Sequence, residues 1–184
     1  MPYTTVSTRS SGYKILASDW NDVINNENWL GNADRCVAVT DTSTASITTA
    51  TQTLMTFATD DYDTGGFHST SSNTSRLTVP TGYGGIYNIF ANVYFTYFAT
   101  TVKPIYLEVR KNAGGVAASG TRIAGATCNT STNSLVMSAA NLSTQVRLAA
   151  TDYIELWCMQ ETGGGLALVG TTQAHRFGMT WVAA

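Results

Sequence analysis

The chain has 184 residues, of which 43% are hydrophobic and only 12% are charged, and its net charge is -2. A chain of this length can form one domain with a small appendage and can bury about 70% of its unfolded surface. The low charge excludes disorder driven by charge repulsion. The ten Lys and Arg residues are scattered singly, so we predict no nucleic-acid partner.

The first residues, MPYTTVSTRSSGYKIL, contain neither the basic region nor the apolar run of a secretory signal peptide. Further along, no stretch approaches the ~20 apolar residues that span a bilayer. We therefore expect no membrane insertion and a protein that is made in a cytosol.

The segment ASDWNDVINNENWLGN predicts a helix over residues 19–30. Ser18 would be its N-cap, Asp19 would lie in the first turn, and Gly31 would be the C′ residue. Helical spacing places one apolar set on one side and Trp29 elsewhere. The apolar set is Leu16, Trp20, Val23, Ile24 and Leu30. The helix therefore needs a partner, either the rest of its own chain or another subunit.

From Cys36 onward the hydrophobic period changes to two, which predicts an N-terminal segment over 1–35 and a β-domain over 36–184. The clearest strand covers residues 86–98, with Tyr87, Ile89, Ala91, Val93, Phe95 and Tyr97 on one face. In the segment IYLEVRKN, the inward residues are Ile105, Leu107 and Val109.

Shorter strands are expected on both sides of these two, and Ile47, Leu54 and Phe57 suit an edge strand. Their ranges are 52–58, 75–79, 121–127, 134–139, 145–148, 153–160, 166–169 and 175–182. Many short strands with turns rich in Gly, Thr and Asn, and no helices between them, predict an antiparallel sandwich or barrel.

Several motifs follow in a recognisable order: TDDYDTGG as an acidic loop, then SRLTVP, TGYGG, IYNIFANVYF, LEVRKN, AATDYIELWCMQ and HRFGMTWV. This order resembles the jelly-roll superfamily that includes tumour necrosis factor and the globular head of the first complement component. The resemblance covers about residues 53–182. It implies a jelly-roll sandwich and a homotrimer, because members of this superfamily pack three sandwiches around an axis lined by aromatic and apolar residues.

Two of the predicted strands have apolar residues on both faces, so one set could line the core and the other a neighbouring subunit. This interpretation assigns the trimer interface to Phe90, Tyr94, Tyr153 and Trp157. The alternative is that loops of the same chain cover these side chains.

The style of LTVPTGYGGIYNIFANV also resembles bacteriophage structural proteins, and the helical segment resembles the linker helix ahead of domains in such virion proteins. This implies a virion protein that binds other virion proteins through its N-terminal segment. The predicted anchor residues are Trp20, Val23, Ile24, Trp29 and Leu30. The role would be capsid decoration or that of an adaptor.

The alternative is a tail-fibre or head-fibre module that binds a host receptor or glycan, with Tyr83, Tyr97 or Trp157 as a stacking platform. An enzyme acting on surface polysaccharide ranks behind both.

Catalytic chemistry is sparse in the sequence, which favours a protein that is not an enzyme and has no cofactor. His68 and His175 lie in or beside predicted strands, where hydrogen-bonded structural roles are expected. Asp152 or Glu155 could pair with Glu161 as in a glycosidase, but nothing in their spacing requires it.

Asp60, Asp61 and Asp63 could bring three carboxylates to one loop and bind Ca²⁺, but acidic turns ahead of Gly-Gly commonly bind no metal. Cys36, Cys128 and Cys158 are interpreted as buried thiols. A disulfide between two of the three is the alternative.

Overall fold

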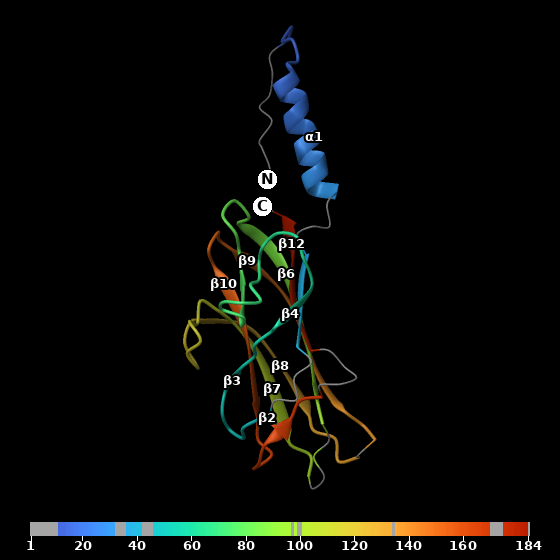
Figure 1. The fold of residues 1–184 in the computed structure, drawn as a ribbon, viewed down its shortest axis with the longest axis vertical. Helices are drawn as coiled ribbons and strands as arrows, with labels where there is room; N and C mark the ends of the chain where they lie inside the picture. The colour runs from blue at the N-terminus through green and yellow to red at the C-terminus, as the bar shows by residue number, and fades with distance from the viewer. Residues whose placement is uncertain are drawn as a thin grey trace.

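A computed structural model describes residues 11–31, 36–41, 46–96, 98, 101–133, 135–169 and 175–183. One helix, α1 (Ala17–Gly31), precedes twelve strands. The helix lies beyond the end of the sandwich at which β12 finishes (Figure 1). The predicted change from helical to strand structure is therefore confirmed.

The helix begins two residues earlier than expected, and Ser18 is not its N-cap. The carbonyl of Leu16 accepts hydrogen bonds from the N–H groups of Asp19 (3.0 Å) and Trp20 (3.3 Å). The Asp19 carboxylate reaches back to accept from the Leu16 N–H at 2.8 Å. This reciprocal arrangement caps the start of the helix through Leu16 and Asp19.

The strands form two main sheets and one short pair, and every pairing between strands is antiparallel. The first sheet has the strand order β4-β1-β12-β6-β9, and we call it sheet I. Its strands are β1 (Cys36–Asp41), β4 (Thr59–Asp63), β6 (Gly85–Phe95), β9 (Ser138–Leu148) and β12 (His175–Ala183).

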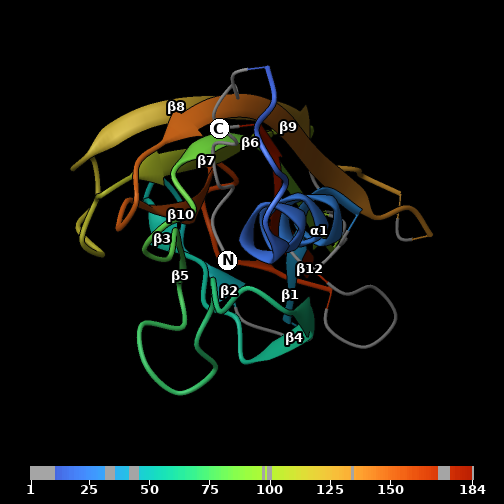
Figure 2. The ribbon, with the colours of Figure 1, turned by 90° about the horizontal axis from the view of Figure 1, so that it is seen from above.

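The second sheet, sheet II, runs β3-β10-β7-β8, and β5 also pairs with β10. Its strands are β3 (Thr53–Leu54), β5 (Arg76–Thr78), β7 (Pro104–Lys111), β8 (Thr121–Asn129) and β10 (Tyr153–Gln160). A small pair, β2 (Ser46–Ile47) with β11 (Leu166–Ala167), completes the fold. Seen from the helix end, the two sheets form the two sides of the sandwich (Figure 2). The predicted antiparallel jelly roll is confirmed.

Strand β9 corrects the prediction of two short strands over 134–139 and 145–148. It is one strand of 11 residues that pairs with β6 along its whole length, from Phe95↔Ser138 to Gly85↔Leu148. Its polar residues imitate a turn in the sequence. They are compatible with a strand because one of them, Asn141, accepts a hydrogen bond from the Asn92 amide on β6 at 2.7 Å.

Strand β4 corrects a second prediction, because the acidic segment begins as a strand and not as a loop. It pairs with β1 at the edge of sheet I, with a bulge between Ala38 and Val39. An edge strand with one partner tolerates charged side chains, which point to solvent or to neighbouring residues. Conversely, the expected strand over 52–58 pairs with β10 only at Thr53 and Leu54.

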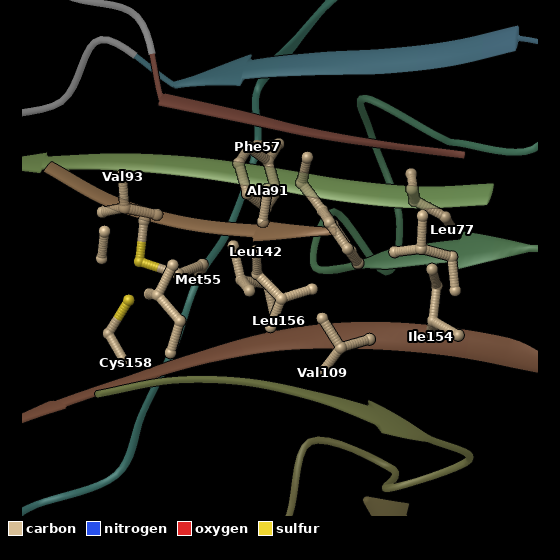
Figure 3. Packing of buried hydrophobic residues seen from close by; sticks show 14 of the residues in the cluster. Met55, Phe57, Leu77, Ala91, Val93, Val109, Leu142, Ile154, Leu156 and Cys158 are labelled. Carbon is tan, nitrogen blue, oxygen red and sulfur yellow. The ribbon is translucent and has the colours of Figure 1, made fainter. Parts of the chain in front are cut away.

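The core lies between the two sheets, where side chains of β6 face those of β10 and β7 (Figure 3). All five described residues of the predicted inward set on β6 are fully buried, and so are Ile105 and Val109 on β7. Tyr97, the sixth member of that set, lies outside the described residues. Phe57 and Phe177 also meet here, with ring centroids 5.8 Å apart. The alternation in the sequence therefore predicted this core correctly.

Candidate functional site

The outer face of sheet I carries two of the predicted interface residues, Phe90 and Tyr94, both half-buried. They alternate along β6 with the inward residues Ala91 and Val93, so their rings point away from the core. Small residues flank the rings: Phe90 lies between Gly178 on β12 and Ser143 on β9. The Phe90 ring therefore stands above its neighbours, whereas the Tyr94 ring lies 6.4 Å from that of His175.

This face carries little charge, although it is open to solvent. In the β6–β9 pair its outward residues include one charged side chain, Arg147, which lies at one end opposite Ile86. On β12, Arg176 is ion-paired with Asp61 of β4, with Nη2 and Oδ2 2.9 Å apart. Aromatic enrichment together with few unpaired charges is the pattern of the central part of a protein interface.

Tyr153 and Trp157, the other two predicted interface residues, lie on β10 in sheet II, on the opposite side of the sandwich. Trp157 retains only 3% of its surface exposed. It therefore has almost no area to bury against another subunit. Tyr153 is half-buried because the Arg76 guanidinium lies over its ring at 4.2 Å. For Trp157 the alternative, cover by the same chain, describes what is observed, whereas Tyr153 is covered only in part.

The helix presents the predicted anchor side chains to solvent. Trp20 is 57% exposed and Ile24 is 49% exposed, while Val23 is half-buried. Trp29 and Leu30 lie within α1, but their side chains fall outside the described residues. Leu16, one turn before Trp20, is also exposed at 55%, so an apolar stripe lies open along the first half of the helix. Among the described residues, no helix is long and apolar enough to cross a membrane.

The acidic segment does not gather its carboxylates into a metal site. The Asp63 carboxylate accepts hydrogen bonds from three backbone N–H groups, those of Gly66, Phe67 and His68, and Asp61 pairs with Arg176. Asp60 instead lies 2.6 Å from the His68 ring. Each carboxylate is thus occupied separately, because successive strand residues point to opposite faces. In the described part of the chain, no group of three or more metal-binding side chains comes together.

Both histidines have structural contacts. The His68 side chain is buried, with Nδ1 facing Asp60 and Nε2 3.1 Å from the Thr74 carbonyl oxygen. His175 is also buried, and its Nδ1 accepts from the Tyr94 N–H at 3.1 Å. The expectation of hydrogen-bonded histidines agrees with this geometry. Tyr83, a suggested stacking platform, packs its ring edge-on with Phe67 at 5.9 Å.

Of the carboxylates considered as a glycosidase pair, Glu155 lies in β10, while Asp152 directly precedes this strand and Glu161 directly follows it. Glu161 comes six positions after Glu155, which corresponds to about 20 Å of extended chain. A glycosidase needs its two carboxylates within about 10 Å. Glu155 instead accepts a hydrogen bond from Arg76 Nε at 2.9 Å, and Asp152 contacts Lys111 at 3.3 Å.

Cys128 and Cys158 are free thiols, Cys158 buried and Cys128 half-buried. Burial raises the pKa of both thiols. The side chain of Cys36 lies outside the described residues.

Solved structures share this fold, although their sequences differ widely from this one. The globular domain of zebrafish complement 1qA aligns with a TM-score of 0.54 and 11% identity, over 80% of this chain and 97% of that domain. Murine APRIL at pH 5.0 aligns with a TM-score of 0.57 and 10% identity, over 80% of this chain and 98% of that chain. The structure of murine APRIL at pH 8.0 gives a TM-score of 0.57 and 12% identity over the same shares.

Comparison with protein-family models gives no match, and comparison with curated proteins gives none either. The similarity therefore shows a fold of the kind found in tumour necrosis factor relatives and complement heads.

Proposed function

We propose that the chain is a non-enzymatic, homotrimeric structural protein of a bacteriophage particle, located on the virion and mounted through its N-terminal segment. Its role is that of a capsid decoration or an adaptor. The observation that carries this proposal is the exposed apolar stripe of α1, which lies outside the sandwich with Trp20 and Ile24 open to solvent. Apolar patches of this kind mark sites of protein interaction.

The trimer is supported by the outer face of sheet I. Phe90 and Tyr94 stand out on a surface whose central part is uncharged, so a neighbouring subunit could cover it without burying an unpaired charge. The fold agrees with the superfamily whose members pack as trimers. The assignment to a phage particle rests on the resemblance of the sequence to virion proteins.

The test measures oligomeric state and particle binding in one set of full-length variants. By light scattering, the wild-type chain is expected to have three times its mass of 19.6 kDa. Phe90→Arg should give a folded single chain, because a charge in the centre of the interface would lose its hydration. Leu135→Arg is the matched control, since Leu135 is 91% exposed in a loop outside the sheets. A monomeric wild type would contradict the trimer.

For the anchor, the double variant Trp20→Ser with Ile24→Ser should remain trimeric and be lost from particles purified on a density gradient. Glu27→Ser changes an exposed polar position of the same helix and should stay on the particles. Retention of the double variant on particles would contradict anchoring through α1.

A further inference from the structure

A pocket of about 160 Å³ opens on the outer face of sheet II, on the opposite side of the sandwich from Phe90. The side chains that line it come from β7, β8, β10 and the segment before β3. They are Gln52, Tyr106, Glu108, Arg122, Trp157 and Met159. Because the two outer faces of a sandwich point in opposite directions, this pocket would stay open in a trimer formed through sheet I.

A glycine makes room for one of the lining side chains, that of Arg122. Glu108 on β7 lies opposite Trp157 on β10 and, on its other side, opposite Gly125 on β8. With no side chain at Gly125, the guanidinium of Arg122 lies across that position, and a Cβ there would come within 2.1 Å of its Nη2. The position of the Arg122 side chain, which lines the pocket, therefore depends on the absence of a Cβ at Gly125.

Charges in the pocket are paired and leave hydrogen-bonding groups available. The Glu108 carboxylate lies 2.7 Å from Arg110 Nη2 and 3.3 Å from Arg122 Nε, and it accepts from the Gln52 amide at 3.1 Å. The Arg122 side chain remains 62% exposed, so its terminal N–H groups can still donate. The lining thus offers donors and acceptors without a strong excess of either charge.

The uncharged lining side chain of Trp157 lacks a hydrogen-bond partner. The indole Nε1 of Trp157 is buried and, within the part of the chain that the structure describes, has no hydrogen-bond acceptor. A buried N–H without an acceptor costs free energy, and the large majority of such groups in proteins are satisfied. A ligand oxygen that reaches this donor through the pocket would satisfy it.

The size and chemistry of the pocket select the class of ligand. A cavity of about 150 Å³ accommodates one six-membered ring, as the binding of benzene in engineered cavities shows. Aromatic side chains together with paired donors and acceptors suit a ring that carries several hydroxyl groups, each of which both donates and accepts. We propose that this pocket binds one pyranose ring of a neutral glycan. The site is independent of the proposed structural role.

The test titrates the full-length protein with methyl glycosides of glucose, galactose, mannose and N-acetylglucosamine, and with glucuronate as the anionic comparison. Binding is followed by saturation-transfer NMR and calorimetry. At least one neutral glycoside should bind with a Kd on the order of 1 mM, a value reasonable for a single small ring. Binding of glucuronate alone, or of no neutral glycoside at tens of millimolar, would overturn the proposal.

Two variants locate the site. Gly125→Ala should fold normally, because the atom it displaces is the end of a flexible side chain, and should weaken binding at least tenfold. Trp157→Phe keeps an aromatic ring but removes the N–H, and should also weaken binding tenfold. Gly164→Ala is the control, since a Cβ there meets open space. Equal affinity in all three variants would overturn the assignment. Binding should persist in the Phe90→Arg chain, so failure of the trimer and failure of this site remain distinguishable.

Discussion

The two outer faces of the sandwich use polar residues in different ways. On sheet II, Glu155 is fully buried and accepts hydrogen bonds from Arg76 Nε and from the Gly115 N–H at 3.1 Å, which fixes the 112–120 loop over the sheet. On sheet I, the Asn92 amide donates to Asn141 in an exposed position. On sheet II the polar groups hold a loop over the sheet, whereas on sheet I they link neighbouring strands and leave the face uncovered by a loop at this point.

The same alternating pattern of aromatic residues therefore does not imply the same exposure to solvent on the two outer faces. Both faces carry aromatic residues at alternating positions. The difference arises from segments far away in the sequence, since the 112–120 loop and β5 cover part of sheet II while Phe90 and Tyr94 remain half-exposed on sheet I.

The largest effect is expected for Glu155→Gln. The change removes a fully buried carboxylate from Arg76 and Gly115, and it leaves the Arg76 charge, whose side chain is 24% exposed, without its partner. Because Arg76 can still reach water, we expect a loss of about 2 to 3 kcal/mol, somewhat less than for a fully buried pair. Urea unfolding followed by circular dichroism measures it.

Glu161→Gln is the matched control, because Glu161 is exposed just beyond the same strand and accepts one hydrogen bond, from the Tyr106 hydroxyl. Its cost should stay within about 0.5 kcal/mol. Equal losses of unfolding free energy in Glu155→Gln and Glu161→Gln would contradict the special role of the buried carboxylate on sheet II.

An intermediate effect is expected for Asp152→Asn, also on the sheet II side. Burial by itself raises the pKa of Asp152, but hydrogen bonds from Asn112 and the Ala149 N–H, with Lys111, outweigh it and lower the pKa. The folded pKa thus lies below the ordinary value of about 3.9, so the carboxylate stabilises the fold above that pH. This contribution disappears as the pH falls through the folded pKa.

At neutral pH the Asp152→Asn variant should therefore be about 1 kcal/mol less stable than the wild type. The difference should shrink towards zero as the pH falls below the ordinary carboxyl pKa and through the lowered pKa of the folded state. Thermal unfolding of both proteins over this pH range provides the measurement, and a difference that grows in acid would show that the sign is wrong.

The smallest effect is expected for Asn92→Ala on sheet I, measured in the Phe90→Arg background so that contacts between subunits do not contribute. An exposed amide pair contributes at most about 0.5 kcal/mol. A cost as large as that of Glu155→Gln would mean that sheet I also depends on its outer polar residues to fold.

Much of the core could be predicted from the sequence, because alternation reports directly which side of a strand a residue occupies. Tyr87 and Val93 were placed correctly for this reason. Alternation does not show which other segments of the chain cover the outward face of a strand. Trp157 looked like an interface residue because its position on β10 is outward, but β3 and the charged residues of β7 bury it.

Two features of the candidate sites had no signal in the sequence. The division of Asp60, Asp61 and Asp63 among separate partners depends on β4 being a strand, which acidic composition disfavours. The role of Gly125 depends on Arg122 crossing from three residues away, which no local pattern encodes. The apolar stripe of α1, in contrast, could be predicted from helical periodicity, although its exposure to solvent could not.

The position of β12 has a consequence for how the protein is made. This strand, formed by residues near the C-terminus, lies between β1 and β6 at the centre of sheet I, so it pairs with the first strand of the chain. Sheet I therefore cannot close until residues 175–183 have been made, and β1 lacks its β12 partner until then. Such pairing between distant segments makes folding slow.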